Sequence, residues 1–170
     1  LGCDTTVLCD DRFDTCYASK HPKHKILGVS NVRDLKGTEK WILKLVKSGK
    51  FDVVIPFTEY SATILSHHKK ELSTYAHLIV NDQNVFDYAQ DKNNVMKVCM
   101  ENDLPCPMTI YDAKSVKDIL SSNIRFPIIL KPSHGFGSHG FHKIDTKEAL
   151  KSCVQKYDID ISKMVVQEYI

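Results

Sequence analysis

Apolar and polar positions alternate with two different periods along the first half of the chain. Thr38–Ser48 places Trp41, Ile42 and Leu45 on one helical face opposite lysines, and Glu59–Leu72 also has a helical period. Strands that alternate with helices are typical of a parallel sheet covered by helices. The short apolar runs that predict buried strands are Thr5–Cys9, Lys25–Val29, Phe51–Pro56 and Leu78–Val80.

The loop Pro56–Glu59 follows one of these predicted strands. Ligands of parallel sheets bind beyond the carboxyl ends of the strands, so this loop is a candidate for ligand contact. The hydroxyl of Thr58 is equally well placed to cap the helix that follows. The sequence leaves these two alternatives open.

A different pattern begins near Asn81 and predicts an antiparallel sheet with helices packed on one side. Leu104–Thr109 is predicted to be non-helical, because its two prolines restrict the residues before them. The predicted helices are Asp91–Asn102, Ser115–Leu120 and Thr146–Tyr157, and the predicted strands are Pro127–Lys131, Phe141–Ile144 and Met164–Tyr169. The expected fold class is therefore α/β. Residues 1–82 form a small parallel sheet with flanking helices, and residues 83–170 form an α+β domain with an antiparallel sheet.

Composition and charge narrow the function classes. The chain has 170 residues, 42% of them hydrophobic and 26% charged, which excludes disordered, collagen-like and coiled-coil proteins. Its net charge of +2 gives no indication of a nucleic-acid partner. No apolar run approaches the roughly 18 residues of a membrane span, so no membrane partner is expected. The chain begins without Met and without a signal peptide, so we expect a processed chain or an excised segment.

The cysteines indicate a reducing compartment rather than a metal site. They form no C-x-x-C pair and have no zinc-finger spacing. We therefore expect reduced thiols and a cytoplasmic location. The cysteines are Cys3, Cys9, Cys16, Cys99, Cys106 and Cys153.

The candidate chemistry lies in residues 131–140, K-P-S-H-G-F-G-S-H-G, which we call the glycine loop. Its glycines let the backbone approach a phosphate closely, and successive N–H groups can turn toward one anion. It contains the G-x-G-x-x-G pattern, but a dinucleotide-binding loop must open a helix, and Phe141–Ile144 is a predicted strand. A Walker A loop needs G-K-[ST], and a kinase flap has its lysine after the loop. A plain glycine hairpin stays open as an alternative.

A lysine that ends one strand, a glycine loop and a second strand together resemble the first part of an ATP-grasp domain. Three further segments resemble motifs of that superfamily in the same order: Asp91-Lys92, Leu104–Thr109 (L-P-C-P-M-T), and Val165–Ile170 (V-V-Q-E-Y-I) at the adenine hinge. Phe126–Pro132 resembles its F-P-x-x-x-K-P strand. Residues 1–82 are similar to the domain that precedes the ATP-grasp domain in biotin carboxylase and carbamoyl-phosphate synthase. Whether this domain has its first strand stays open.

The resemblance implies an ATP site and assigns no catalytic residue. Lys92 and Lys131 are expected on the phosphates, Gln167 at the adenine amino group, and the carbonyl of Glu168 and the N–H of Ile170 at the adenine edge. His139 stands where many relatives have Arg or Lys. His134, His139 and His142 could instead suggest a metal, but they lack a carboxylate partner. The residues expected to form the phosphate-binding flap are Ser133, Gly135, Gly137, Ser138 and Gly140.

The implied function is that of an ATP-grasp ligase, which activates a carboxylate as an acyl phosphate for attack by an amine or other nucleophile. ATP and Mg²⁺ are the expected cofactors. The Mg²⁺ ligands are expected outside this chain, which stops at the hinge, so the chain alone is expected to be inactive. The expected partners are ATP and small-molecule carboxylate and amine substrates, with a homodimer left open. Two alternatives remain: a non-catalytic ATP-binding or regulatory module, and an interaction domain.

Overall fold

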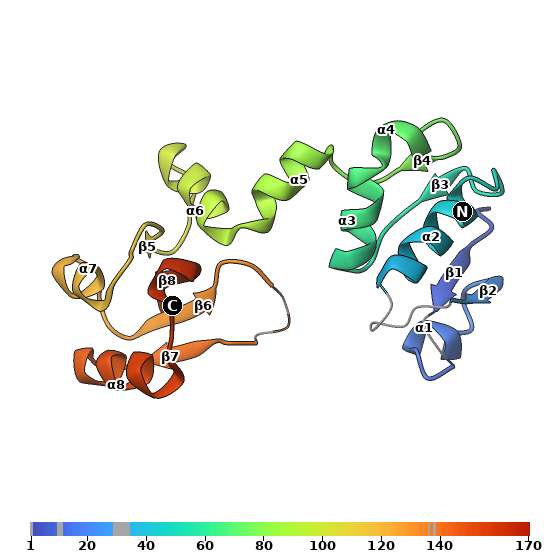
Figure 1. Cartoon of the computed structure of the whole chain (residues 1–170). Coiled ribbons are helices and arrows are strands. Elements are labelled where there is room, and N and C mark those ends of the chain that lie inside the picture. Colours follow the sequence, from blue (N-terminus) through green and yellow to red (C-terminus); the bar gives the residue numbers. More distant parts are fainter. Residues whose placement is uncertain (1, 10–11, 29–34, 136, 138) are drawn as a thin grey trace. The chain divides into compact units, whose positions relative to one another are not determined.

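The computed structural model describes residues 2–9, 12–28, 35–135, 137 and 139–170. It divides into two compact units, Leu1–Gln83 and Asn84–Ile170, which we describe separately (Figure 1). In the described residues, no helix is both long enough and apolar enough to cross a membrane. All six cysteines are present as thiols.

In its described residues, the first unit contains two pairs of parallel strands rather than one continuous sheet. Strand β1 (Thr6–Cys9) pairs with β2 (His24–Leu27), and β3 (Val53–Val54) pairs with β4 (His77–Leu78). The predicted parallel pairing is thus confirmed, although β3 and β4 are shorter than expected. One reason is Pro56, which has no N–H to donate to a longer ladder. Val29, the predicted end of the second strand, lies outside the described residues.

In the first unit one helix, α1, was not predicted, and one predicted helix is divided in two. Helices α1 (Thr15–Ala18) and α2 (Leu35–Val46) follow β1 and β2. The predicted helix Glu59–Leu72 is two helices, α3 (Glu59–His67) and α4 (Lys69–Leu72), because His68 leaves the helical conformation at φ −103° and ψ 10°. The prediction of one continuous helix was wrong at His68, where no Gly or Pro in the sequence indicates a break.

Thr58 caps α3, which confirms one of the two alternatives for the loop before it. Its Oγ1 accepts a hydrogen bond from the N–H of Ser61 at 3.1 Å, and the hydroxyl of Ser61 accepts one from the N–H of Thr58 at 3.2 Å. This reciprocal capping box satisfies two backbone donors that the first turn leaves unpaired.

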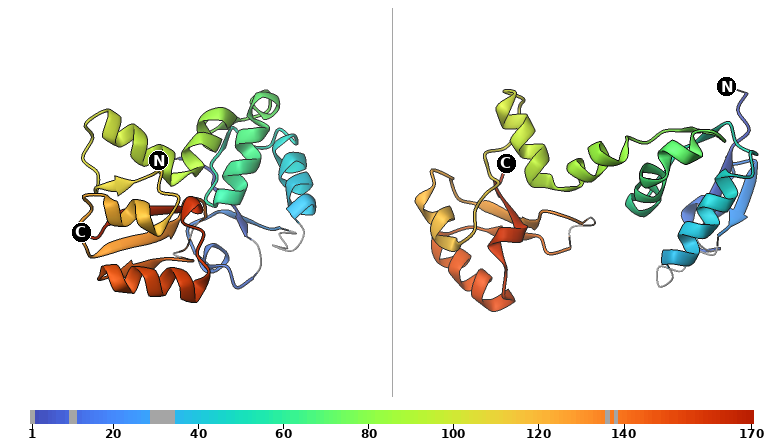
Figure 2. Two further views of the ribbon diagram at one scale, coloured as in Figure 1. Left: turned by 60° about the vertical axis from the view of Figure 1, so that its left-hand side comes forward. Right: turned by 45° about the horizontal axis from the view of Figure 1, so that its top comes forward.

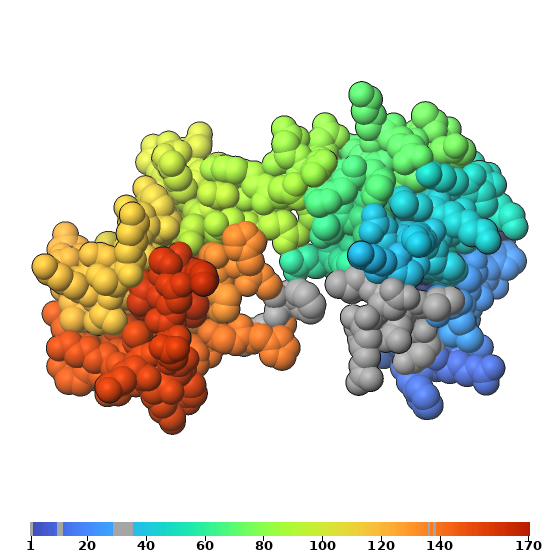
Figure 3. All heavy atoms as spheres, viewed as in Figure 1, coloured from blue at the N-terminus to red at the C-terminus, as the bar shows by residue number. Residues whose placement is uncertain are grey.

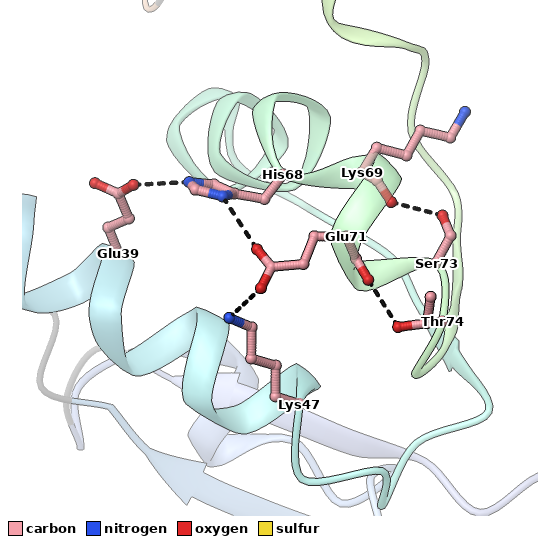
Figure 4. Close-up of polar contacts among 7 residues, drawn as sticks. All are labelled: Glu39, Lys47, His68, Lys69, Glu71, Ser73 and Thr74. Carbon is pink, nitrogen blue, oxygen red and sulfur yellow. Dashed lines mark hydrogen bonds and ion pairs between the residues drawn. The ribbon is translucent and has the colours of Figure 1, made fainter.

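The interior of the first unit is an apolar cluster between α2 and the α3–α4 pair. It consists of Ile42, Val46, Ile64, Leu65, Leu72, Ala76 and Leu78. Polar contacts at its edge join the same helices (Figure 4). His68 Nε2 lies 2.9 Å from Glu39 Oε1, and Lys47 Nζ lies 2.5 Å from Glu71 Oε1. The hydrogen bond from Lys47 holds the pKa of the Glu71 carboxyl below its ordinary value.

The second unit is built on a four-stranded antiparallel sheet in the order β5-β8-β6-β7 (Figure 2). The strands are β5 (Thr109–Ile110), β6 (Ile128–Pro132), β7 (His142–Ile144) and β8 (Met164–Glu168). Three of them match predicted strands. The short β5 lies at the end of the proline-containing segment, whose prolines keep it out of a helix.

In the described part of the second unit, four helices and one 3₁₀ turn accompany the sheet. Three helices match predictions: α6 (Lys92–Glu101), α7 (Val116–Ser121) and α8 (Lys147–Tyr157), capped by Asp91, Ser115 and Thr146 respectively. Helix α5 (Gln83–Gln90) was not predicted, and the 3₁₀ turn η1 (Ile161–Lys163) precedes β8.

The two faces of this sheet differ in chemistry. One face packs against α7 and α8 and forms the core, which includes Ile119, Ile128, Leu130, Ile144, Leu150 and Val166. Because successive side chains of a strand point to opposite faces, Lys131 and Gln167 lie on the other face. Helix α6 contacts that second face, since Met96 accepts a hydrogen bond from Gln167. This second face carries Lys131, whose side chain lines a cavity together with residues of the glycine loop.

Candidate nucleotide-binding site

Two lysines from distant parts of the chain meet at the glycine loop. Lys131 is the penultimate residue of β6, and Lys92 is the first residue of α6. Both line a cavity of about 180 Å³ that the loop partly encloses, and Figure 3 shows the described atoms of that loop, in orange, projecting from the second unit. The other lining residues are Pro132, His134, Gly135, Gly137, His139 and Phe141. Among the described residues that line the cavity, none carries a carboxylate.

Lys92 fastens the start of α6 to the glycine loop. Its backbone N–H donates to the carbonyl of Ser133 at 2.9 Å. Its Nζ donates to the carbonyl of Gly135 at 2.7 Å and, more weakly, to that of Ser133 at 3.3 Å. An ammonium group has three donors, so one remains for an anion in the cavity. The expected phosphate contact of Lys92 stays a prediction.

Among the described residues, no carboxylate forms an ion pair with Lys131. Its Nζ donates to Gln167 Oε1 at 2.9 Å. Burial, and secondarily the positive charge of Lys92, lower the pKa of the Lys131 ammonium below its ordinary value. Two like charges held together without a counter-ion favour the binding of an anion. The expected phosphate contact of Lys131 also stays a prediction.

Gln167 is almost fully buried, with 5% of its surface exposed. Its Nε2 donates to Thr109 Oγ1 at 2.9 Å and contacts Met96 Sδ at 3.2 Å. Its Oε1 already accepts from Lys131 but has a second lone pair. The expected contact between Gln167 and an adenine amino group therefore stays a prediction and depends on that lone pair.

The flap residues predicted from the sequence differ in what they contribute. Gly135, Gly137 and Gly140 have positive φ values of 102°, 71° and 72°, which explains why glycine occupies these turns. Gly135 and Gly137 line the cavity, whereas Gly140 packs against Pro132. Ser133 is only 7% exposed, and its hydroxyl lies 2.9 Å from His134 Nδ1. Ser138 lies outside the described residues.

The predicted adenine hinge follows β8. The N–H of Glu168 donates to the carbonyl of Met108 at 2.9 Å, and Glu168 Oε1 accepts from the N–H of Met108 at 2.8 Å. The N–H of Tyr169 donates to the carbonyl of Pro127 at 3.0 Å. Ile170 is 87% exposed. The roles expected of the Glu168 carbonyl and the Ile170 N–H stay predictions.

Sequence reasoning missed the residues that support the lysines. Thr109 and Met96 had no assigned role, yet each contacts Gln167, which in turn contacts Lys131. The side chain of Glu168 was also missed, and it accepts a hydrogen bond from the N–H of Met108. The sequence analysis did not place Lys131 and Gln167 together, because their contact depends on the register of β6 and β8. No group of three or more His, Cys, Asp or Glu side chains that could hold a metal ion occurs in the described part of the chain.

A second hollow is lined by lysines in the first unit. It has a volume of about 600 Å³ and lies on α2, with Lys40, Leu43, Lys44, Lys47 and Ser48 as its lining. Lys47 forms an ion pair with Glu71. This hollow has no glycine loop, so the cavity beside Lys131 is the better candidate for a phosphate group.

Comparison with known proteins gives one curated relative and several solved structures. No family model matches the chain. A D-alanine–D-alanine ligase of Hydrogenovibrio crunogenus is 37% identical over 71 residues, which cover 39% of this chain and 22% of that enzyme. The L-amino acid ligase of Bacillus licheniformis superposes with a TM-score of 0.65 at 15% identity, covering 99% of this chain and 39% of that one.

A third similar protein is the biotin carboxylase domain of the Hydrogenobacter thermophilus 2-oxoglutarate carboxylase, solved with MgADP, ADP and bicarbonate. Its TM-score is 0.66 at 17% identity, covering 99% of this chain and 39% of that chain. These enzymes are ATP-grasp ligases. The resemblance to the ATP-grasp superfamily is therefore confirmed at the level of fold, and the chain has the fold of part of an ATP-grasp ligase. It spans well under half the length of the proteins it matches.

Proposed function

We propose that this chain provides the ATP-binding part of a ligase that activates a carboxylate as an acyl phosphate for attack by an amine or another nucleophile. The observation that carries the proposal is the meeting of Lys92 and Lys131 at a cavity enclosed by the glycine loop. The fold shared with ATP-grasp ligases supports the assignment of the anion as a nucleotide phosphate.

The described residues fit a polyphosphate chain. The cavity of about 180 Å³ offers two ammonium groups, and its glycines bring backbone close to whatever occupies it. This volume suits phosphate groups rather than a whole nucleotide. The adenine would then lie along the second face of the sheet toward Glu168 and Ile170, which follow Gln167 on the chain.

The chemistry that these residues contribute is electrostatic. When bound, Mg²⁺–ATP supplies the phosphoryl group that a carboxylate oxygen accepts as ADP leaves, and the nucleophile then displaces phosphate. Lys131 and Lys92 hold the phosphates by charge-assisted hydrogen bonds and stabilise the negative charge that develops during transfer. The Mg²⁺ ligands are proposed to lie outside this chain.

A calorimetric titration of Mg²⁺–ATP into the chain and its Lys131→Met variant tests the binding site. Loss of one charge-assisted hydrogen bond costs about 1.5–3 kcal/mol, which is about 10- to 150-fold in affinity. Lys151→Met, on the exposed side of α8, is the matched control and should bind like the wild type. Equal affinity in wild type and Lys131→Met would contradict the proposed site.

The chemical step requires a chain that also carries the remaining part of the enzymes that this one resembles. Such a chain should release ADP in the presence of Mg²⁺–ATP, a suitable carboxylate and an amine. Binding of ATP with no ADP release across a broad panel of carboxylates would instead support a non-catalytic nucleotide-binding module.

A further inference from the structure

The ammonium of Lys131 is held by a neutral partner. Gln167 Oε1 accepts its hydrogen bond at 2.9 Å, and the other titratable groups that line the same cavity are Lys92, His134 and His139. No carboxylate among the described lining residues neutralises this charge. The position of the ammonium therefore depends on an amide whose own orientation must be fixed.

The sheet register brings the two side chains together. Gln167 lies directly opposite Ile129 on β6, and Lys131 lies directly opposite Val165 on β8. Lys131 and Gln167 are thus diagonal neighbours on one face of an antiparallel pair, within reach of long side chains. On its other side, Gln167 lies directly opposite Thr109 of β5.

A chain of hydrogen bonds fixes which end of the Gln167 amide faces the lysine. The hydroxyl of Thr109 donates to the carbonyl of Pro107 at 2.8 Å, so toward Gln167 it acts as an acceptor. The NH₂ group of Gln167 must therefore face Thr109, at 2.9 Å. The carbonyl end is left for the ammonium, which can only donate. Both Thr109 and Gln167 are buried, with 4% and 5% of their surface exposed.

We propose that Gln167 is a positioning residue for Lys131, holding its ammonium at the cavity through the chain Pro107–Thr109–Gln167 while leaving its charge available to an anion. The proposal rests on the proposed nucleotide site for its biological meaning, but the contact itself exists without a ligand. A neutral acceptor fixes the lysine without neutralising it. A carboxylate at this position would hold the ammonium equally well and cancel its charge.

The first test measures the pKa of the Lys131 ammonium in the ligand-free protein by NMR of isotope-labelled lysine side chains. Gln167→Leu removes the acceptor of the charged form and should lower this pKa relative to the wild type, whereas Gln167→Glu should raise it. Thr109→Val removes the acceptor of the Gln167 NH₂ group, so the amide is no longer held in its orientation toward Lys131. This variant should therefore also lower the pKa of the Lys131 ammonium. Gln155→Leu, at an exposed position of α8, is the matched control and should leave it unchanged.

The second test measures binding of inorganic triphosphate at neutral pH. Gln167→Leu and Gln167→Glu should each weaken binding about tenfold, one by freeing the ammonium and the other by neutralising it. The two variants thus share a loss of affinity but shift the pKa in opposite directions, which misfolding would not produce. Circular dichroism and thermal unfolding of each variant establish that it is folded.

The outcomes separate the two proposals. An unchanged Lys131 pKa in folded Gln167→Leu and Gln167→Glu would overturn the positioning role, whatever the chain binds. If the pKa shifts occur as expected but the wild type binds no triphosphate, the positioning role stands and the proposed nucleotide site is wrong.

Discussion

Gly140 is the position at which a single methyl group should most disturb the glycine loop. Its φ is +72°, and a Cβ built on it would lie 2.9 Å from Cγ and 3.3 Å from Cδ of Pro132. The first distance is shorter than side-chain carbons tolerate, and a proline ring cannot rotate away. Pro132 ends β6 and Gly140 leads into β7, so the substitution Gly140→Ala should push apart the two ends of the loop.

The size of the effect follows from two separate costs. A left-handed backbone conformation costs an L-residue about 1–2 kcal/mol. Overpacking against a rigid neighbour costs about 1–3 kcal/mol. Gly140→Ala should therefore lower the free energy of unfolding by about 2–5 kcal/mol. Gly137 has nearly the same φ, +71°, but its Cβ would meet only His139, at 3.5 Å, which is ordinary contact. Gly137→Ala should therefore lose only about 1–2 kcal/mol.

Hydrogen exchange provides the assay, because it reports opening of the paired strands β6 and β7 rather than unfolding of either unit as a whole. The amides to follow are those of Ile128–Leu130 and His142–Ile144, which pair across the hairpin. Mg²⁺–ATP affinity should fall further in Gly140→Ala than in Gly137→Ala. Equal protection losses in the two variants would refute the packing argument and leave only the backbone cost.

The remaining predictions concern the two lysines. Because the pKa of Lys131 is lowered from its ordinary value of 10.5, Mg²⁺–ATP affinity should decline as pH rises through that lowered pKa. Lys131→Met should abolish this decline in a calorimetric pH series. The same shift makes the unfolded chain bind more protons between the lowered and the ordinary pKa, so stability should rise with pH across that window, and a flat urea-unfolding profile there would contradict it. Lys92→Met should speed amide exchange at Ser133–Gly135 even without nucleotide, because it removes the bonds from Lys92 Nζ to the loop carbonyls. Lys97→Met, an exposed change on the same helix, should not, and equal exchange in the two variants would exclude the fastening role of Lys92.

The elements of the second unit were largely predictable because their signals are local. Strand β6 is a continuous apolar run that ends in Lys131-Pro132, and α8 begins at a capping threonine. Helix α5 was missed although its apolar positions have a helical period. That apolar side is not buried in the core, since Val85 and Tyr88 are about half exposed. The break at His68 was missed because its conformation is not required by any residue type.

The sequence predicted where the site residues lie along the chain, but not which of them contact one another. The glycines and Lys131 form one continuous segment, and their association with an anion follows from their chemistry. The contact of Gln167 with Thr109 and Lys131 depends on the register of three strands, which pairs residues 58 positions apart. Such long-range pairings are decided by the packing of the whole sheet, so the supporting network appears only in the structure.

The central claim is that the anion site lies beside Lys131, and amide NMR shifts on addition of Mg²⁺–ATP test it most directly. The account predicts shifts at Lys92, at Ser133–Gly140 and at Gln167–Ile170, all in the second unit, and their loss in Lys131→Met. Shifts confined to the lysine-lined hollow of α2, at Lys40–Ser48, would contradict it, as would a spectrum that ATP leaves unchanged.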